Sequence, residues 1–567
     1  MPTQTFNQKG SKKAYRMNQK NRQFYLLLFI LALVVNFCTI NFLFFTDDPG
    51  LYASIAKQLI YKHDFFQLYS YGADWLDKPH LPFWLVMISF RTFGIYTWTY
   101  KLPAIICFLL SLLYTWLFAR KYYGAEVAAM AVLIVSTSLH VMMSNTDIRA
   151  EPYLMAFITG AIYHISNLER RSSGTQLVLA ALLTALAVMT KGVFVMIAIY
   201  GALGGHLLLA GKLKEVFRFK WVLLVILTVI FSAPELYSLY IQFDLHPEKV
   251  VFGHQHVSGI KWFLWDSQFG RFTNSGPISR KTGSIFYFLH TLLWAFGPWC
   301  LLFYFSVYKI VSDIIKRKHQ REYYAISGGL ILLALFSLSG FQLPFYTNII
   351  FPLFAICTAR ICHEQLTSST ERTIRSVAQW IYVIALPIVV ILLNYFLKPA
   401  HYWPFIIDII VFVPIAIYLL KSGKQMSSQL FLLNCVAMLF ACFYVNTEFY
   451  PTIIRYKGEP KAARYVNQQV PQTTAVYSVK SLNNVFQFYC DRPVGLFNME
   501  QFNATPSPAG ALFYADQESV DQLRSLHQQF VVVKEFCNYP EENILPAFIN
   551  ESTRASTLSK VYLIKKP

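Results

Sequence analysis

Acidic and basic side chains recur at the ends of long apolar segments in this sequence, where charge is costly. They are Asp47, Asp48, Asp77, Lys78, Asp147, Arg149, Glu151, Lys191 and Arg271. A carboxylate can accept a proton during a reaction, and a lysine or arginine can hold an anion or stabilise a growing negative charge. Any one of these charges could be an ordinary solvated loop residue. Their repeated placement at a hydrophobic boundary, however, indicates a functional site.

The composition places the chain in a membrane. Its 567 residues are 55% hydrophobic and 14% charged, with a mean hydropathy of +0.41, which excludes an ordinary soluble enzyme. The net charge of +19 does not indicate nucleic-acid binding, because the Lys and Arg residues form short clusters between apolar segments. We therefore predict an α-helical polytopic membrane protein with no nucleic-acid partner.

Thirteen apolar segments are each close to the roughly 20 residues that a helix needs to cross a bilayer. They lie at 24–45, 102–119, 125–142, 150–168, 175–190, 193–210, 219–237, 284–310, 323–339, 343–362, 376–396, 401–420 and 429–447. Residues 1–23 contain Lys and Arg but no acidic residue. We therefore predict a cytoplasmic N-terminal tail at 1–23 and a transmembrane domain at 24–447.

The apolar stretch at 81–95 is shorter and is followed at once by another apolar segment. If it crossed the membrane, the basic clusters at 120–121, 170–171 and 212–220 would lie outside, against the tendency of Lys and Arg to remain in the cytoplasm. We therefore expect it to be a helix lying in the membrane interface. With that assignment, all the charged residues introduced above share the outer face of the membrane.

Two loops, at 46–101 and 241–283, and a polar tail at 448–567 are then expected on the outer side. The tail alternates short apolar stretches such as "TAVYSV" with polar helical stretches such as "DQESVDQLRSLHQQF". This alternation predicts a small α/β domain. Cys490 and Cys537 of the tail could form a disulfide if their compartment is oxidising.

Several motifs occur in the order seen in the C-type (GT-C) glycosyltransferases. They are "FTDDPGLYASIAKQL", "WLDKPHLPFWLVMISFRTFG", "YKLPAI", "FARKYYG", "NTDIRAEPYLMAF", "AVMTKGVF", "FGPW" and "SLSGFQLPFY". The series resembles the bacterial branch that includes the 4-amino-4-deoxy-L-arabinose transferases of lipid A and the protein O-mannosyltransferases. This resemblance implies transfer of a sugar from a polyprenyl-phosphate carrier, such as undecaprenyl phosphate, at the periplasmic face of the bacterial inner membrane. The acceptor would be lipid A, another envelope glycan or a protein.

The resemblance also implies roles for individual residues. Asp47 matches the acidic residue of the first outer loop and is the candidate base or acceptor-orienting carboxylate. Asp48 stands where the family often has glutamate, and it could instead cap the helix that begins near Pro49. Lys78 matches the lysine of the family's "KPP" element, here "KPH", and is the candidate ligand of the carrier phosphate.

The remaining charges receive supporting roles from the same resemblance. Asp147 matches a second outer-loop acid, which could hold the acceptor or orient Lys78. Lys191 and Arg271 are further candidate phosphate ligands. The other two charges, Arg149 and Glu151, could equally form a local ion pair. In an inverting transfer the base takes the acceptor's hydroxyl proton while the phosphate leaves, so a carboxylate and a cation should face each other across the anomeric carbon.

A metal site is a weaker interpretation of the motif "FGHQHVSG". His254 and His256 alternate as they would on one face of a strand, and Asp77 could add an oxygen ligand. Two histidines in a long loop are more often ordinary surface residues. We therefore expect turnover to require no cofactor, with a divalent metal as the alternative.

The sequence is also compatible with two other classes of function. A transporter or lipid flippase would be expected to show internal repeats and charges near the middle of the membrane, whereas here no repeat is evident and the charges gather at one face. A noncatalytic envelope-assembly protein would use the tail as a recognition surface. A transfer assay with a lipid-linked sugar separates these classes from an enzyme.

Overall fold

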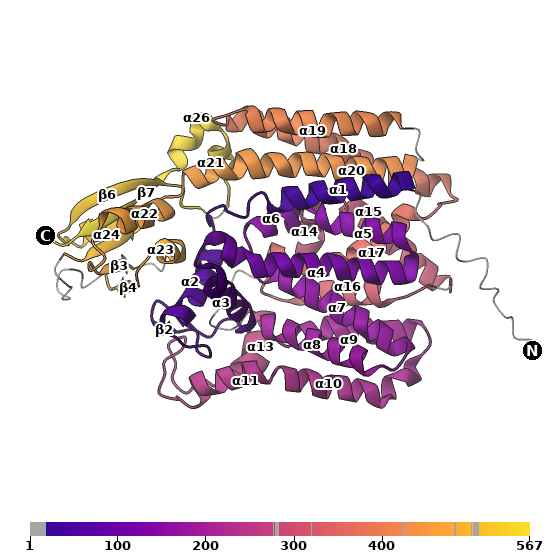
Figure 1. The fold of residues 1–567 in the computed structure, drawn as a ribbon, viewed down its shortest axis with the longest axis horizontal. Helices are drawn as coiled ribbons and strands as arrows, with labels where there is room; N and C mark the ends of the chain where they lie inside the picture. The colour runs from indigo at the N-terminus through magenta and orange to yellow at the C-terminus, as the bar shows by residue number, and fades with distance from the viewer. Residues whose placement is uncertain are drawn as a thin grey trace, which may run out of the picture.

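The chain folds into a large helical bundle with a smaller α/β domain at one end (Figure 1). The computed structural model describes residues 19–275, 277, 283–318, 320–422, 426–480, 483–499, 502, 508, 510–541 and 543–567. Most of the predicted cytoplasmic tail at 1–23, and the end of the predicted loop at 241–283, lie outside the described residues.

Each of the predicted apolar segments contains helix. The bundle consists of α1 (Gln19–Phe37), α4 (Thr97–Tyr123), α5 (Ala125–Ser136), α6 (Leu139–Thr146), α7 (Glu151–Arg170), α8 (Gly174–Lys191), α9 (Val195–Leu209), η1 (Leu213–Phe217), α10 (Phe219–Phe231), α14 (Tyr287–Ala295), α15 (Cys300–Ile315), α16 (Tyr324–Leu338), η4 (Pro344–Ile350), α17 (Phe351–His363), α18 (Ser369–Leu397), α19 (Trp403–Lys421) and α20 (Met426–Tyr444). Among the described residues, six helices are long and apolar enough to cross a membrane, or up to eight if each bent pair is one span. The chain is therefore an α-helical polytopic membrane protein, and the number of thirteen spans stays a prediction.

Three predicted spans are interrupted. The segment 125–142 is divided between α5 and α6, and the segment 219–237 is divided between α10 and α11 (Ala233–Leu239). The segment 284–310 is divided between α14 and α15, and the chain passes through Gly297 and Pro298 between them. Proline has no backbone N–H to donate and clashes with the preceding helical turn. A single straight helix across this segment is therefore not formed.

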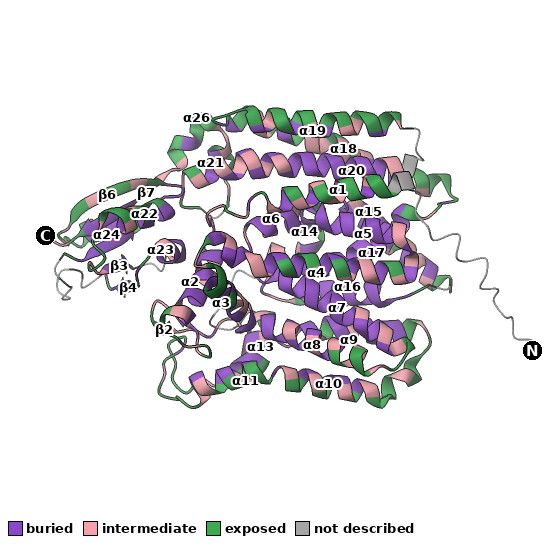
Figure 2. Ribbon diagram, in the orientation of Figure 1, coloured by how far each residue is buried: buried purple, intermediate pink, exposed green. Residues whose placement is uncertain are grey.

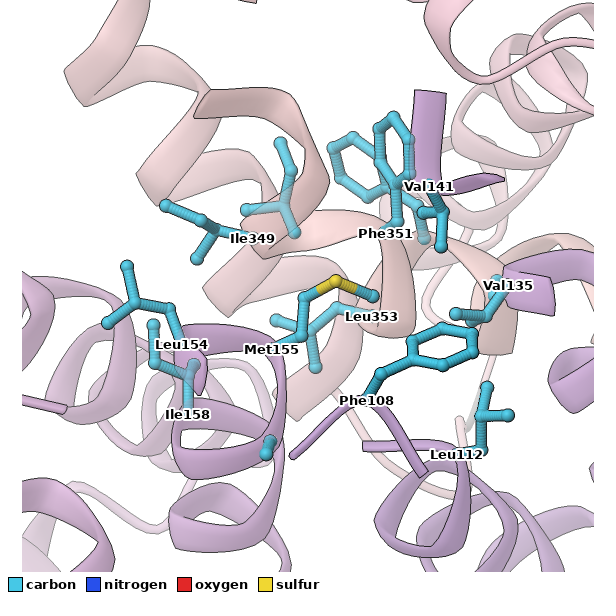
Figure 3. Close-up of a cluster of buried hydrophobic side chains, with 14 of the residues drawn as sticks. Phe108, Leu112, Val135, Val141, Leu154, Met155, Ile158, Ile349, Phe351 and Leu353 are labelled. Carbon is cyan, nitrogen blue, oxygen red and sulfur yellow. The ribbon is translucent and has the colours of Figure 1, made fainter. Parts of the chain in front are cut away.

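The interior of the bundle is packed with aliphatic and aromatic side chains (Figure 3). Phe108, Leu112, Val135, Val141, Leu154, Met155, Ile158, Ile349, Phe351 and Leu353 are all buried in this core. Leu154 and Ile158 are four residues apart on α7, so they share one face of that helix. The core thus joins helices that are distant in sequence and gives the charged helix ends a rigid base.

The helices at the edge of the bundle are apolar but exposed. Only 11% of the most apolar window of α18 and 22% of that of α19 are buried, whereas 83% of that of α20 is buried. Figure 2 shows the contrast between the exposed α19 and the more buried α20. Apolar helix faces of this size are expected to contact lipid.

The two outer loops form short elements at the end of the bundle where the α/β domain also lies (Figure 1). The first loop contains α2 (Asp47–Tyr61), β1 (Tyr69–Ser70), β2 (Ala73–Asp74) and α3 (Leu81–Phe93), and the second contains η2 (Tyr240–Asp244), α12 (Gly259–Lys261), η3 (Trp262–Asp266) and α13 (Ser267–Thr273). The second loop directly follows α11 (Ala233–Leu239), which overlaps the predicted span 219–237. The helix predicted at 81–95 is thus present as α3. With 13 residues it is shorter than the roughly 20 residues of a bilayer crossing.

The predicted cytoplasmic basic clusters gather at the opposite end of the bundle. Helix α7 begins at Glu151, next to the outer loops, and ends at Arg170. Near that far end, Lys121 donates hydrogen bonds to Ser166 and Asn167, and other basic side chains from α10 and the preceding turn reach the end of the same helix. The charges of the outer loops and these basic clusters therefore lie at opposite ends of one helix.

The tail forms a five-stranded mixed sheet with helices on both faces. Helix α20 continues toward it through η5 (Val445–Phe449) and α21 (Tyr450–Arg455), which belong to the same candidate span Ser428–Arg455. The elements of the domain are α22 (Glu459–Gln469), β3 (Val476–Val479), α23 (Asn484–Tyr489), β4 (Val494–Phe497), β5 (Leu512–Asp516), α24 (Gln517–Ser525), β6 (Val531–Asn538), α25 (Pro546–Ile549), α26 (Glu551–Arg554), η6 (Ala555–Thr557) and β7 (Ser559–Lys565). The strand order is β4-β3-β5-β7-β6. Leu512 and Tyr514 pack with α22 and α23, whereas Phe513 and Ala515 pack with α24, as the alternation of side chains along a strand requires.

The α/β domain rests directly on the first outer loop. A Cβ atom at Gly50 of α2 would lie 2.9 Å from the backbone nitrogen of Val485 of α23, so only glycine allows this close approach. Nearby, Lys57 donates hydrogen bonds to the carbonyl oxygens of Phe488 (2.9 Å) and Cys490 (2.5 Å). Burial lowers the pKa of Lys57 to about 8. The contact between α2 and α23 is thus close and polar at its centre.

Candidate functional site

Eight of the nine charged residues singled out in the sequence form three groups of ion pairs at the outer-loop end of the bundle. The first group is Asp77, Lys78 and Arg271, the second is Asp48, Asp147 and Arg149, and the third is Glu151 and Lys191. Asp47 lies apart from them and faces the C-terminal domain.

Asp77 lies between two cations. Its Oδ2 is 2.5 Å from Nζ of Lys78, which stands just before α3, and its Oδ1 is paired with the guanidinium of Arg271 on α13. Burial opposes ionisation of Asp77, but Lys78 and Arg271 outweigh it and hold the pKa of its carboxyl below the ordinary value. The two outer loops therefore meet at an ion-paired centre that joins residues far apart in sequence.

Arg149 links the acids of the second group. Its Nη1 lies 2.7 Å from Oδ2 of Asp48 and its Nη2 lies 3.6 Å from Oδ2 of Asp147. Asp147 also accepts a 2.5 Å hydrogen bond from the hydroxyl of Thr46, and its Oδ1 is buried without a hydrogen-bond partner in the described part of the chain. Burial raises the pKa of Asp147. Arg149 thus holds a half-exposed carboxylate on one side and a more enclosed one on the other.

The third group is buried at the end of a predicted span. Lys191 is the last residue of α8, and its Nζ lies 2.7 Å from Oε1 of Glu151 at the start of α7. Gly192 ends the helix with φ of +107°, and Gln268 fills the space where a side chain would be. The ammonium group also lies 4.0 Å from the ring centre of Tyr346 on η4. Lys191 is therefore fixed by a carboxylate and an aromatic face.

Asp47 is held by the C-terminal domain. Its Oδ2 accepts a 2.5 Å hydrogen bond from the amide of Asn484, and its Oδ1 accepts one of 3.2 Å from the backbone N–H of the same residue. Asn484 is the first residue of α23, so the carboxylate lies at the start of that helix. Asp47 and Asp48 are neighbours in sequence, yet their carboxylates face different parts of the molecule.

Two small cavities adjoin the ion pairs. One, of about 20 Å³, is lined by Tyr52, Lys78, Tyr100 and Arg149 together with apolar side chains. The other, of about 80 Å³, is lined by Lys191, Arg271 and Tyr346 together with apolar and small polar side chains. Asp77 pairs with a cation from each cavity. The cations therefore border two neighbouring spaces in largely apolar surroundings, where an anion would be strongly attracted.

The histidines of "FGHQHVSG" do not reach this centre. His254 and His256 are exposed in the second outer loop, and Asp77, the proposed third ligand, is paired with Lys78 and Arg271. Within the described ranges, no three His, Cys, Asp or Glu side chains are grouped so that they could hold a metal ion.

The two cysteines of the tail are unpaired in the structure. Cys490 is buried at the end of α23, whereas Cys537 is exposed on strand β6, and both are free thiols. The disulfide considered from the sequence is therefore not formed.

Several residues of this region were not found from the sequence. Phe345 stacks 4.2 Å below the guanidinium of Arg149, and its neighbour Tyr346 faces Lys191. Both belong to the motif "SLSGFQLPFY", but nothing in the motif itself marks aromatic residues as partners of cations. His80 and Glu235 form a buried pair next to Lys78, and 155 residues separate them in sequence.

Comparisons with known proteins agree with this fold. The family model "Dolichyl-phosphate-mannose-protein mannosyltransferase" matches residues 77–237. The crystal structure of ArnT from Cupriavidus metallidurans bound to undecaprenyl phosphate has a TM-score of 0.73 at 17% sequence identity, and the match covers 95% of this chain and 98% of that chain. The apo state of the same protein also has a TM-score of 0.73, at 16% identity, with 96% of this chain and 98% of that chain covered.

Two relatives are similar in sequence. An uncharacterized protein of Aquifex aeolicus (strain VF5) is 20% identical over 477 residues, which are 83% of this chain and 87% of that protein. The undecaprenyl phosphate-alpha-4-amino-4-deoxy-L-arabinose arabinosyl transferase of Edwardsiella ictaluri (strain 93-146) is 22% identical over 339 residues, which are 59% of this chain and 58% of that protein.

The bundle, the outer-loop helices and the C-terminal domain together have the GT-C fold of the ArnT structures. The chain is also similar in sequence to a protein-mannosyltransferase family model over residues 77–237 and to an ArnT-like transferase over 339 residues. The resemblance noted in the sequence is thereby confirmed.

Proposed function

We propose that this chain is an inverting glycosyltransferase that moves a sugar from a polyprenyl-phosphate carrier to an acceptor. The observation that carries the proposal is the set of three cations, Lys78, Lys191 and Arg271, which border two adjoining cavities at one end of a membrane bundle. The same architecture occurs in a protein whose structure contains undecaprenyl phosphate. Lys78 and Arg271 share one carboxylate, Asp77, between them, and cations at the edge of an apolar bundle suit a lipid-linked phosphate.

The carrier phosphate would exchange with an internal carboxylate. Asp77 pairs with Lys78 and Arg271 in the structure, and a phosphate entering between these two cations would take over both contacts. Helix α3, which begins at Leu81, is apolar and would offer the prenyl chain a surface beside Lys78. As the bond between the sugar and the phosphate oxygen breaks, the cations would stabilise the negative charge that grows on the phosphate. The loss of one such group costs on the order of 3 kcal/mol of barrier.

The transfer itself is a substitution at the anomeric carbon. The acceptor oxygen forms the new bond to that carbon while the bond from carbon to phosphate oxygen breaks, and the phosphate leaves with the bonding electron pair. The acceptor's proton passes to a carboxylate on the opposite side. In this scheme the attacking group and the leaving group are separated by the sugar, so the base and the cations belong on opposite sides of the cavity.

The geometry favours Asp48 over Asp47 as this base. The side chain of Asp48 is 44% exposed and paired with Arg149, which lines the same cavity as Lys78. The carboxylate of Asp47 is engaged by Asn484. We assign Asp147 the role of orienting Arg149, because both share the second group of ion pairs.

The proposed site faces the periplasm of the bacterial inner membrane. This orientation follows from the basic clusters at the other end of the bundle, because Lys and Arg favour the cytoplasmic side. Lipid A, another envelope glycan and a protein are the candidate acceptors, each of which is reached from that side.

Comparative lipid and envelope analysis of a deletion strain tests the proposal. Mass spectrometry should find that a polyprenyl-phosphate-linked sugar accumulates and that one envelope acceptor loses the same sugar. A plasmid with the wild-type gene should reverse both changes. A deletion strain with unchanged polyprenyl-phosphate sugars and unchanged envelope glycans would contradict the proposal.

A further inference from the structure

His80, two residues after Lys78 in the sequence, forms a buried pair with Glu235. Oε2 of Glu235 accepts a 2.9 Å hydrogen bond from the backbone N–H of His80, and Oε1 lies 2.9 Å from Nδ1 of the same residue. The side chains are 1% and 0% exposed. One carboxylate on α11 therefore holds both the main chain and the ring of the residue that directly precedes α3.

The ring is held on its other side as well. Nε2 of His80 lies 3.1 Å from the carbonyl oxygen of Phe66, and a carbonyl can only accept a hydrogen bond. Nε2 must therefore donate, which leaves one proton to be shared between Nδ1 and Oε1 of Glu235. With that proton on either atom the pair is neutral overall, so its burial avoids the cost of an isolated charge.

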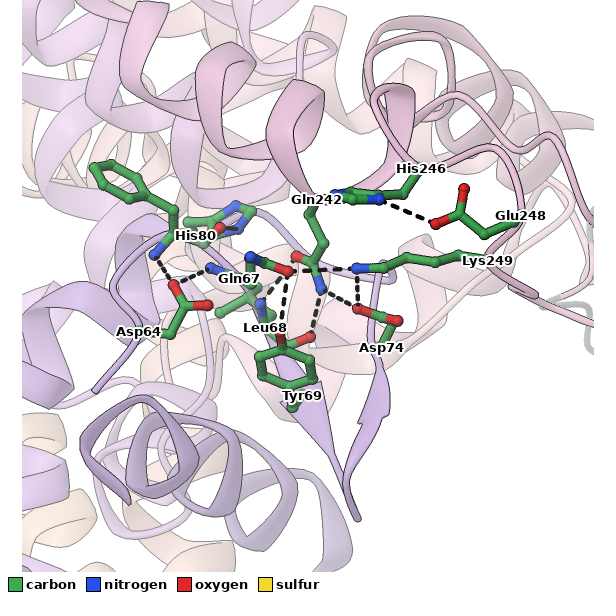
Figure 4. A network of polar contacts seen from close by, with 11 residues as sticks. Asp64, Gln67, Leu68, Tyr69, Asp74, His80, Gln242, His246, Glu248 and Lys249 are labelled. Atoms are coloured by element: carbon green, nitrogen blue, oxygen red, sulfur yellow. Dashed lines mark hydrogen bonds and ion pairs between the residues drawn. The ribbon is translucent and has the colours of Figure 1, made fainter. Parts of the chain in front are cut away.

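The pair belongs to a larger seam between the first outer loop and the segment Ala233–Asp244. Seven residues beyond Glu235, Gln242 exchanges hydrogen bonds with the backbone N–H and carbonyl of Leu68 and donates a third to Asp74. Figure 4 shows this network, with His80, Leu68, Gln242 and Asp74 drawn as sticks. Residues on both sides of Lys78 are thus tied to this segment.

The contact with Glu235 depends on the histidine at position 80. The resembling "KPP" element has proline at this position, and proline has neither a backbone N–H nor a ring that could donate to Glu235. Histidine offers both. The short link through Pro79, whose φ is restricted by its ring, then transmits the position of His80 to Lys78.

We propose that Glu235 is a positioning residue for the donor phosphate, acting through His80 to hold Lys78 at the proposed binding site. This inference rests on the proposed function and extends it to residues that touch neither phosphate nor sugar. Asp77, which is also paired with Arg271, fixes the ammonium end of Lys78, and Glu235 fixes the backbone from which the side chain extends.

The test measures binding of undecaprenyl phosphate to the purified full-length protein, together with the thermal midpoint of the empty protein. Glu235→Ala should weaken binding about tenfold or more, because the backbone and the ring of His80 lose their acceptor. Glu235→Gln should bind within about twofold of wild type, because its amide can accept from the backbone N–H and donate to Nδ1 of a neutral ring.

If Glu235→Ala does not fold, a single and a double variant that both contain His80→Pro provide a second test. His80→Pro alone leaves Glu235 buried without its donors and should bind weakly. His80→Pro with Glu235→Leu removes the unpaired buried carboxylate and should bind about tenfold more tightly than His80→Pro alone. Equal binding by the single and double variants would overturn the proposal.

Asp244→Ala is the matched control. Asp244 lies in the second outer loop, close to Glu235 in sequence, and accepts hydrogen bonds from Ser258 and two backbone N–H groups, but none of these contacts involves the Lys78 segment. This variant should lower the thermal midpoint and leave the affinity unchanged. A Glu235→Ala protein that behaves in the same way would show a structural role only, and loss of binding in Glu235→Gln would also overturn the proposal.

Lys78→Ala distinguishes an error in the positioning role of Glu235 from an error in the proposed phosphate site. If Lys78→Ala loses affinity while Glu235→Ala does not, the positioning role is wrong and the phosphate site stands. If Lys78→Ala binds undecaprenyl phosphate as wild type does, the proposed phosphate site itself is wrong.

Discussion

Asp48 and Arg149 form an ion pair with 2.7 Å between Oδ2 and Nη1, and this contact joins a carboxylate of the first outer loop to Arg149, which lines the same cavity as Lys78. The preceding residue, Asp47, is bound to Asn484 instead. Two adjacent acids therefore connect α2 to two different partners. One partner belongs to the bundle and the other to the C-terminal domain.

Substitution of each acid in turn should separate their roles. We expect Asp48→Asn to lower the rate of transfer about a hundredfold or more with nearly unchanged undecaprenyl phosphate binding, because a proton acceptor is removed at constant volume. Asp47→Asn should retain most of the transfer rate and loosen the contact with Asn484. Rate and affinity measurements on both variants check this, and the opposite ranking would restore Asp47 as the base.

Asp147 should make the stability of the protein depend on pH. Burial raises its folded-state pKa above the unfolded value of about 3.9, so the folded state binds this proton more tightly. Its contribution to stability is present below the unfolded pKa and is lost as the pH rises through the raised value. Asp147→Asn cannot ionise. Its thermal midpoint should therefore rise relative to wild type from acidic to neutral pH, and a difference that is independent of pH would contradict this assignment.

Cysteine labelling can test the orientation of the bundle. In a background with Cys38 and Cys537 replaced by serine, a probe that cannot cross the inner membrane should not modify a cysteine at Gly174, an exposed position where an added side chain would meet open space. It should modify a cysteine at Glu248, whose side chain is 68% exposed at the opposite end. The probe is applied to cells with a permeabilised outer membrane. Labelling at Gly174 but not at Glu248 would invert the topology and place the proposed site in the cytoplasm.

The sequence was sufficient to predict the charged end of the bundle. Hydropathy identifies helices, and charges such as Lys191 fall at their ends because an apolar interior cannot hold them. The bias of Lys and Arg toward one side then identifies the helix at 81–95 as the exception, and the structure contains a short helix at that position.

The partners of those charges could not be predicted in the same way. Asp47 and Asp48 are both at the start of α2, where successive side chains point in directions about 100° apart, so the orientation of each depends on packing against α23. The pairing of His80 with Glu235 depends on how the first outer loop folds over α11. The spacing of hydrophobic residues and the composition of a segment predict its local structure. The partners of Asp47, Asp48 and His80, by contrast, depend on the tertiary fold.

The most direct test of the central claim is a transfer reaction with purified wild-type protein and Lys78→Ala, supplied with polyprenyl-phosphate-linked sugars extracted from the deletion strain and with its envelope fraction as acceptor. Mass spectrometry follows the release of free polyprenyl phosphate. We expect wild type to release it as an envelope acceptor gains the sugar, and Lys78→Ala to be slower by about a hundredfold, because one phosphate-stabilising cation is lost. No release by wild type, or equal rates for the two proteins, would contradict the account.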